Sequence, residues 1–198
     1  DLLNAYAIHS LHGRAIPNAI GIKIANHKMP VLAIVGDGDC YGEGGNHLIH
    51  ACRGNHDITV IVHDNGVYGL TTGQSAPTAQ KGFKSKSTPT GILETPINPL
   101  ALTITSGATF VAQSFAGDVI HTISMIKAGI EHKGFSVVNI LQPCVTFNKV
   151  NTYQYYLKNV YKLDESYKKD DFKTAVQKSL EINEEKFPLG IIYQKEKS

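Results

Sequence analysis

The 198-residue sequence has no tryptophan, only three cysteines, and no apolar run long enough to span a bilayer. Cys40, Cys52 and Cys144 include no Cys-x-x-Cys pair, which argues against a disulfide framework and a self-contained zinc site. Cys40 and Cys52 are therefore expected to be small buried side chains. Nothing resembles a signal peptide, so we expect a cytoplasmic protein without membrane contact. A first residue of Asp1 rather than Met suggests a missing N-terminal piece.

The sequence also lacks an excess of charge of one sign. It has 19 Lys and Arg against 17 Asp and Glu, a net charge of +2, which does not favour nucleic acid as a partner. With 42% hydrophobic residues, a chain of 198 residues suits one α/β domain with a sizeable core, or such a domain with a short appendage.

Two short apolar runs, residues 31–35 and 58–62, are typical of buried parallel strands. Further strands are expected over 107–115 and 135–141, and helices over 13–26, 42–51, 118–133 and 171–185. The helix over 118–133 is expected to turn Ile120, Ile123, Ile126 and Ile130 inward. This order of elements predicts an α/β fold, with a parallel sheet covered by helices on both faces.

Two segments lack the pattern of a packed core. Residues 71–99 carry four prolines and no apolar periodicity, so we expect a functional loop with too little apolar content to order itself until a cofactor binds. Residues 151–198 carry Lys and Glu clusters. We interpret them as a C-terminal extension for subunit docking, appended to a cofactor-binding domain over residues 1–150.

The strand over 31–35 is followed by Gly36, Asp37 and Gly38, and 26 residues separate Gly38 from Asn65. Because ligands bind parallel sheets at the carboxyl ends of their strands, Asp37 and Asn65 are expected on neighbouring loops. A carboxylate, an amide oxygen and a backbone carbonyl suit Mg²⁺, and a helix beginning beside Asp39 favours a phosphate. The pattern predicts a site for magnesium and a diphosphate.

Two other phosphate-binding motifs do not fit. A dinucleotide-binding Gly-x-Gly-x-x-Gly motif needs Gly or Ala at position 41, where Tyr41 stands. A Walker phosphate loop needs Gly-Lys-Ser or Gly-Lys-Thr, and neither follows the strand.

The Gly-Asp-Gly, the gap and Asn65 match the thiamine diphosphate signature. Residues 9–14 (His-Ser-Leu-His-Gly-Arg), 68–74 (Tyr-Gly-Leu-Thr-Thr-Gly-Gln) and 142–148 (Gln-Pro-Cys-Val-Thr-Phe-Asn) resemble the β subunit of 2-oxoacid:ferredoxin oxidoreductases of the pyruvate or 2-oxoglutarate type. The resemblance implies a thiamine-diphosphate-binding fold. It also implies oxidative decarboxylation of a 2-oxoacid, with coenzyme A as acyl acceptor and electrons passed through Fe–S centres to ferredoxin. The glutamate that activates the cofactor would come from an α-type partner subunit.

The resemblance also implies roles for individual residues. Mg²⁺ would be bound by Asp37, Asn65 and the carbonyl of Val67. The remaining contacts to the cofactor would come from Gly36, Gly38 and Asp39 near the diphosphate and from Tyr68, Gly69 and Leu70 beneath the bent molecule. His12 is the candidate catalytic residue, as a cation near the diphosphate or the oxoacid carboxylate, with Arg14 a weaker candidate. Helix capping and a satisfied buried histidine are the alternative.

Cys144 takes a specific meaning from the resemblance. Similar β subunits bind a 4Fe–4S cluster through three cysteines near the N-terminus and a fourth in the Gln-Pro-Cys segment, the position of Cys144. One thiolate cannot hold such a cluster, so either the other ligands lie upstream of Asp1 or this member lacks the cluster. Thr72 stands where some relatives carry Lys, which leaves the choice of 2-oxoacid open.

Two rival functions remain at this stage. A thiamine diphosphate enzyme of the transketolase or acetolactate-synthase type would share Asp37 and Asn65 but would not need Cys144. A non-catalytic phosphate-binding or assembly subunit would bind no thiamine diphosphate at all.

Overall fold

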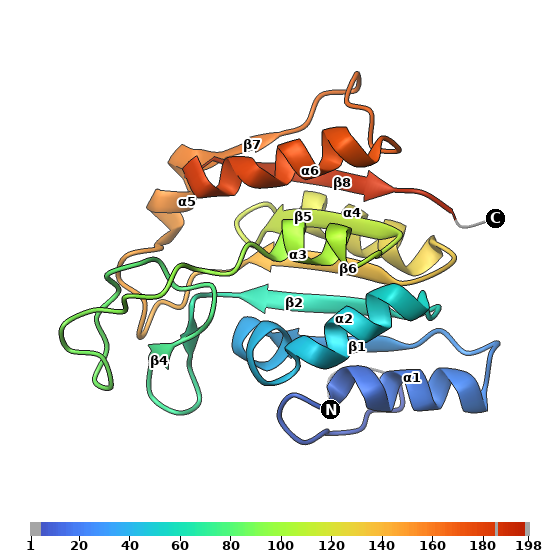
Figure 1. The fold of residues 1–198 in the computed structure, drawn as a ribbon, viewed down its shortest axis with the longest axis horizontal. Helices are drawn as coiled ribbons and strands as arrows, with labels where there is room; N and C mark the ends of the chain where they lie inside the picture. The colour runs from blue at the N-terminus through green and yellow to red at the C-terminus, as the bar shows by residue number, and fades with distance from the viewer. Residues whose placement is uncertain (1–4, 185, 197–198) are drawn as a thin grey trace.

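A six-stranded sheet forms the centre of the structure, a computed structural model that describes residues 5–184 and 186–196 (Figure 1). In spatial order its strands are β1 (Leu32–Gly36), β2 (Thr59–Asp64), β6 (Ser136–Leu141), β5 (Phe110–Phe115), β8 (Phe187–Gln194) and β7 (Val160–Lys162). The first four are mutually parallel, whereas β8 pairs antiparallel with β5 and parallel with β7. The expected α/β fold is confirmed, but β8 and β7 both run antiparallel to the first four strands, which was not foreseen.

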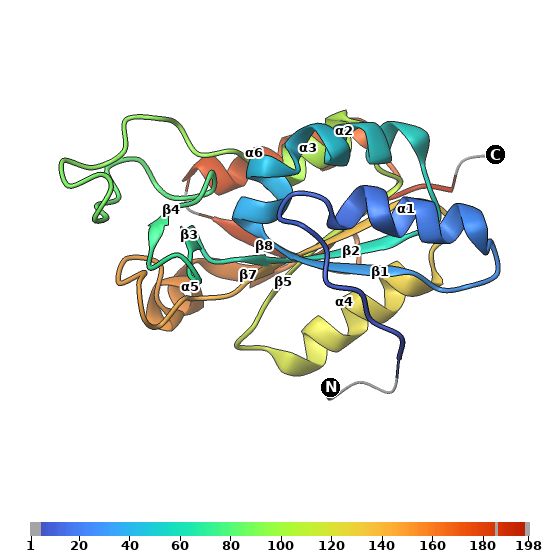
Figure 2. The same cartoon turned by 90° about the horizontal axis from the view of Figure 1, so that it is seen from below.

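Helices cover both faces of the sheet, as the sequence predicted (Figure 2). The helical elements are α1 (Ala15–Ala25), the π-helical turn η1 (Gly38–Glu43), α2 (Gly45–Gly54), α3 (Pro99–Thr105), α4 (Val119–Glu131), α5 (Tyr153–Asn159), α6 (Phe172–Leu180) and the 3-10 turn η2 (Glu181–Glu184). Of these, α2, α3 and α6 lie on one face and α4 on the other. Within the described residues, no helix has the length and apolar content needed to cross a membrane.

The core lies where the parallel strands are covered on both sides. Every residue of β5 and β6 is buried, because parallel strands enclosed by helices have no solvated face. Cys40 and Cys52 are buried in this core beside Leu48, which confirms their expected role as small apolar side chains.

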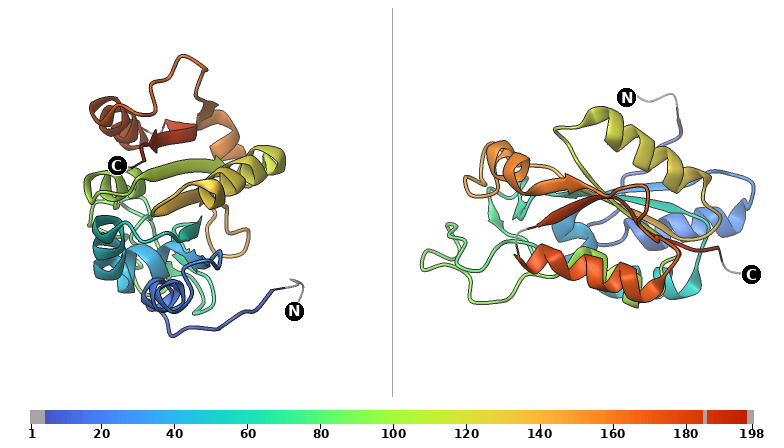
Figure 3. Two further views of the ribbon diagram at one scale, coloured as in Figure 1. Left: turned by 90° about the vertical axis from the view of Figure 1, so that its right-hand side faces the viewer. Right: turned by 90° about the horizontal axis from the view of Figure 1, so that it is seen from above.

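The inward face of α4 differs from the prediction. Ile120 and Ile123 are 83% and 60% exposed, and Ile130 is 39% exposed. Of the four isoleucines only Ile126 packs beneath the helix, against the cluster that contains Phe110. Figure 3 shows that the start of α4 lies further from the sheet than its end, which accounts for the exposure of Ile120 and Ile123 near its start.

The long segment over residues 71–99 projects from the edge of the sheet toward which β2 points (Figure 1). Its first residues belong to a hairpin in which β4 (Gln74–Ser75) pairs antiparallel with β3 (Val67–Tyr68). Ala79 and Phe83 are buried against Val67, with Ile92 and Cys144 packed around them. The sequence did not indicate that this segment contains an apolar cluster of its own. Whether the segment is ordered without a cofactor stays a prediction.

Residues 151–198 contribute α5, β7, α6 and β8. They are continuous with the rest of the fold, because β8 hydrogen-bonds to β5 in the central sheet. Whether residues 1–150 and 151–198 act as separate units, and whether the second docks a partner subunit, stay predictions.

Candidate functional site

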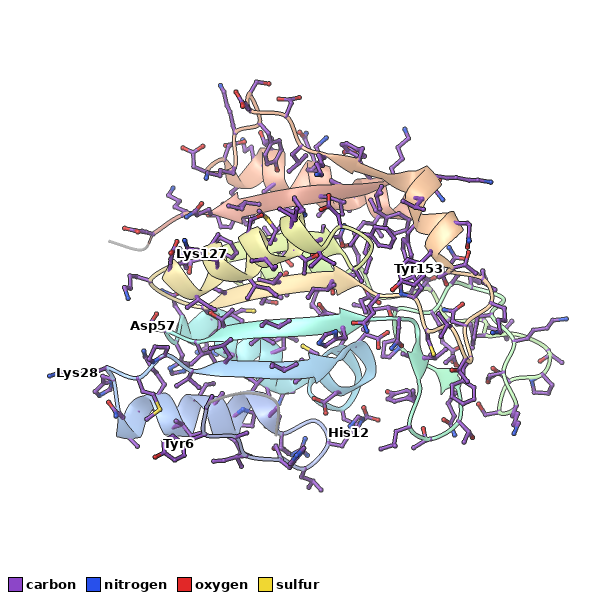
Figure 4. All side chains as sticks on the ribbon, turned by 180° about the vertical axis from the view of Figure 1, so that it is seen from behind. Tyr6, His12, Lys28, Asp57, Lys127 and Tyr153 are labelled. Carbon is purple, nitrogen blue, oxygen red and sulfur yellow. The ribbon has the colours of Figure 1, made fainter. Side chains whose placement is uncertain are left out.

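The candidate site lies at the carboxyl ends of β1 and β2, where parallel α/β sheets bind ligands. Asp37 directly follows β1, and Asn65 directly follows β2. Figure 4 shows His12 at this end of the sheet, with Asp57 and Lys28 at the opposite end. The two loops therefore meet as the sequence predicted.

Asp37 is buried, with only 1% of its surface exposed. One carboxylate oxygen accepts hydrogen bonds from the Gly66 N–H, at 2.8 Å, and from the Thr78 hydroxyl. Burial nevertheless raises the pKa of Asp37 above its ordinary value, because desolvation of the charged form outweighs these bonds. Thr78, in the long loop, was not identified from the sequence.

A second buried carboxylate, Asp64, ends β2 next to this site. Burial, followed by the negative charge of Asp37, raises the pKa of Asp64 to about 7. Among the described residues, no Lys, Arg or His forms an ion pair with either carboxylate. Two buried acids without a cationic side chain form an environment that a divalent cation would stabilise.

The loop after β2 supplies the other two oxygen ligands that the resemblance implies. Asn65 uses its side-chain oxygen to accept the Val67 N–H at 3.0 Å, which closes an Asx turn. Together with Asp37, the Asn65 amide oxygen and the Val67 carbonyl form a set of hard oxygen donors, which fits Mg²⁺. Their binding of Mg²⁺ stays a prediction.

Tyr68 and Gly38 lie in direct contact. A Cβ on Gly38 would overlap the Tyr68 ring, so glycine is required for this approach. The Tyr68 hydroxyl also donates a hydrogen bond to a Glu43 carboxylate oxygen at 3.1 Å. Gly69 and Leu70 follow at the tip of the hairpin, where Leu70 is fully exposed.

His12 lies beside the residues expected to contact the diphosphate. Its Nδ1 is 3.0 Å from an Asp39 carboxylate oxygen, and its Nε2 is 3.1 Å from one of Glu43. The ring centroid is 5.9 Å from that of Tyr68. Half of the His12 side chain is exposed, so it is not a buried structural histidine. Arg14 instead donates to the Gly13 carbonyl at 3.1 Å. Catalysis by His12 stays a prediction.

Cys144 is half-buried against the apolar cluster of the long loop. In the described part of the chain, no group of three or more His, Cys, Asp or Glu side chains could hold a metal ion. Within that part of the chain, Cys144 therefore does not belong to a ligand set large enough for a 4Fe–4S cluster.

Two family descriptions match the sequence. Residues 1–140 match the thiamine pyrophosphate enzyme C-terminal domain, which binds thiamine pyrophosphate. Residues 144–198 match the C-terminal region of the pyruvate ferredoxin oxidoreductase β subunit. The first match confirms thiamine diphosphate as the cofactor expected for this fold.

The chain is also similar in sequence to individual proteins. It is 48% identical over 98% of its length to the 2-oxoacid:ferredoxin oxidoreductase subunit beta of Saccharolobus solfataricus, covering 67% of that protein. It is 41% identical to subunit beta of 2-oxoacid:ferredoxin oxidoreductase 1 of Aeropyrum pernix, with 96% and 63% of the two chains covered. This chain thus spans about two thirds of the length of these relatives.

A solved structure supports the same assignment. The 2-oxoglutarate:ferredoxin oxidoreductase of Magnetococcus marinus, solved with 2-oxoglutarate, coenzyme A and succinyl-CoA bound, aligns with a TM-score of 0.93 at 38% identity. The alignment covers 98% of this chain and 67% of that one. The motifs, the fold and these similarities together show that the chain belongs to the family of β subunits of 2-oxoacid:ferredoxin oxidoreductases.

Proposed function

We propose that this chain binds the diphosphate end of thiamine diphosphate through Mg²⁺, as the β subunit of a 2-oxoacid:ferredoxin oxidoreductase. One observation carries the proposal. The buried Asp37 carboxylate accepts a hydrogen bond from the Asn65–Val67 loop and lies next to Asp64. Among the described residues, no Lys, Arg or His side chain forms an ion pair with either carboxylate. A hard divalent cation would offset this buried negative charge and would in turn hold a diphosphate.

When bound, thiamine diphosphate would supply an electron sink for the loss of CO₂ from a 2-oxoacid. The chain's own residues would then have simple tasks. Asp37, Asn65 and the Val67 carbonyl hold the metal, while Gly36, Gly38 and Asp39 contact the diphosphate. Tyr68, Gly69 and Leu70 support the organic part of the cofactor.

His12 would hold a proton near the site. The carboxylates of Asp39 and Glu43 lie 3.0 and 3.1 Å from its two ring nitrogens and so fix the orientation of the ring. As a cation, His12 would attract an anionic group of cofactor or substrate beside the diphosphate.

The finer features of the reaction belong to the assembled enzyme. We propose an α-type partner that brings the activating glutamate, a 2-oxoacid substrate, coenzyme A as acyl acceptor and ferredoxin as electron acceptor. Cys144 would provide one thiolate of an Fe–S cluster, and residues 151–198 would dock the partner in the cytoplasm. The Magnetococcus marinus structure, with its 2-oxoglutarate and coenzyme A, supports this substrate class.

The two rivals are less well supported. An enzyme of the transketolase or acetolactate-synthase type would not account for the match of residues 144–198 to the ferredoxin oxidoreductase β subunit. A non-catalytic phosphate-binding subunit would not account for the match of residues 1–140 to a thiamine pyrophosphate binding domain.

The test compares the purified chain with the chain co-purified with its α-type partner. Labelled CO₂ release from pyruvate or 2-oxoglutarate and reduction of ferredoxin are measured with thiamine diphosphate, Mg²⁺ and coenzyme A. We expect both activities from the assembly and neither from the chain alone. Absence of 2-oxoacid-dependent ferredoxin reduction in the assembly would contradict the proposal.

A further inference from the structure

Asn148, the last residue of the 142–148 motif, is buried beneath the loop that follows β2 and is only 1% exposed. From its contacts we infer that Asn148 is a positioning residue that sets the geometry of the metal-binding loop. This inference rests on the proposed function, because it assigns a second layer of residues to the same Mg²⁺ site.

The side chain of Asn148 forms four hydrogen bonds. Its amide nitrogen donates to the backbone carbonyl of Asn65 at 2.9 Å and to the side-chain oxygen of Asn151 at 3.2 Å. Its oxygen accepts from the backbone N–H groups of Val150 and Asn151, at 3.0 and 2.9 Å. A buried amide with this many partners has its rotamer and position fixed.

The orientation of this amide follows from its partners. Backbone N–H groups can only donate, so the atom facing Val150 and Asn151 must be the oxygen. The amide nitrogen therefore faces Asn65. A side chain that cannot donate would leave the partly buried carbonyl of Asn65 without this bond.

One peptide unit links Asn148 to the metal site. The carbonyl of the Asn65–Gly66 peptide accepts from Asn148, and the N–H of the same peptide donates to Asp37 at 2.8 Å. In a trans peptide these two groups point in opposite directions, so Asn148 and Asp37 hold the unit from opposite sides. Gly66 has φ of +71°, so the backbone there is in a left-handed conformation that glycine adopts without strain.

This peptide connects the two predicted ligands of the loop. Asn65 carries the amide oxygen on its N-terminal side, and the Val67 carbonyl follows one residue after Gly66. Rotation of the peptide would turn both oxygens relative to Asp37. Residues that orient metal ligands in this way raise metal affinity, and removing them costs about 10- to 100-fold in affinity.

A purely structural role is the alternative, since Asn148 also stabilises the turn over residues 148–151. Asn148→Asp separates the two roles. Its carboxylate can still accept from Val150 and Asn151, but it cannot donate to the Asn65 carbonyl. Asn148→Ser is a milder variant without added charge. Its hydroxyl can support the turn but is too short to reach Asn65.

Asn55→Asp is the matched control. Asn55 ends α2 at the opposite end of the sheet, and its side-chain oxygen accepts from the Thr109 hydroxyl and the Phe135 N–H. An aspartate keeps both of these acceptor roles. The change is therefore chemically identical to Asn148→Asp but distant from the site.

The experiment is calorimetric titration of thiamine diphosphate at a series of Mg²⁺ concentrations, with the chain co-purified with its α-type partner. We expect Asn148→Asp to raise the Mg²⁺ concentration for half-maximal cofactor binding by about tenfold or more. Asn148→Ser should shift it less and in the same direction. At saturating Mg²⁺ the cofactor affinity should return toward that of the wild type, and Asn55→Asp should leave the Mg²⁺ dependence unchanged.

Thermal unfolding of each variant is measured in parallel. A lower melting temperature with a wild-type Mg²⁺ requirement, in either Asn148 variant, would overturn the inference and leave Asn148 as a turn residue only. If the wild type itself shows no Mg²⁺-dependent binding, the proposed function fails, and the inference that rests on it fails with it.

Discussion

Asp64 and Asp37 are two buried carboxylates at adjacent strand ends, and the charge of Asp37 helps to raise the pKa of Asp64 to about 7. The Asn139 amide donates to Asp64 at 3.1 Å, but this neutral partner does not offset the negative charge. The protonation of Asp64 is therefore linked to the occupancy of the proposed metal site at Asp37.

This link predicts a pH-dependent stability in the absence of metal. The pKa of Asp64 is higher in the folded chain than in the unfolded one. The contribution of Asp64 to the free energy of unfolding is therefore fully present below pH 4 and is lost as pH rises toward 7. We expect the free energy of unfolding to fall by on the order of 2 kcal/mol between pH 5 and pH 8 through this residue. Urea unfolding at a series of pH values, with a chelator present to remove metal ions, measures this fall.

Asp64→Asn provides the comparison. The variant cannot ionise and keeps an oxygen to accept from Asn139, so it should lack this part of the fall. Identical pH profiles for the two proteins would show that Asp64 does not titrate as described. Adding Mg²⁺ and thiamine diphosphate to the wild type should reduce the fall, since a bound cation favours the ionised carboxylates.

The contact between Gly38 and Tyr68 predicts a different effect at each glycine of the Gly-Asp-Gly motif. Gly38→Ala should lower the free energy of unfolding by about 1–3 kcal/mol, because its Cβ would overlap the Tyr68 ring. Gly36→Ala meets no atom within 4 Å and should change stability by about 0.5 kcal/mol or less.

A double mutant identifies the cause of the Gly38 effect. In a Tyr68→Ala background the ring is gone, so Gly38→Ala should cost much less than in the wild type. Equal costs in the two backgrounds, measured by chemical unfolding, would rule out the ring as the source.

The long loop over residues 71–99 should respond to the cofactor. The Thr78 hydroxyl donates to Asp37, so a metal at Asp37 would act directly on the loop. We expect hydrogen exchange in residues 71–99 to slow when thiamine diphosphate and Mg²⁺ are added, while amides of α4 keep their rates. Equal protection of the loop with and without the cofactor would refute the coupling.

Much of the site could be predicted because its sequence signals are local. β1 and β2 are short apolar runs, and the ligands that follow them stand at fixed positions in the chain. β8 gives a weaker signal, because Pro188 and Gly190 interrupt its apolar residues, and the strand was missed.

The polar residues around the ligands could not be predicted from pattern alone. Asp64, Thr78 and Asn148 are distant from one another in sequence, and only the folded chain shows that they surround Asp37 and the Asn65–Gly66 peptide. Likewise the isoleucine spacing in α4 indicates a helix face but not how far that face lies from the sheet, so Ile120 and Ile123 were wrongly placed in the core.

The central claim is that Asp37 anchors a metal-bound diphosphate, and Asp37→Asn tests it most directly. The amide keeps the size of the side chain and removes the charge, so the fold should survive. Asp57→Asn is the control, since Asp57 lies at the opposite end of the sheet and pairs with Lys23 at 2.7 Å (Figure 4). The measurement is calorimetric titration of thiamine diphosphate with and without Mg²⁺. We expect Asp37→Asn to weaken Mg²⁺-dependent binding by about 100-fold or more and Asp57→Asn to leave it unchanged; wild-type affinity and Mg²⁺ dependence in a folded Asp37→Asn variant would contradict the claim.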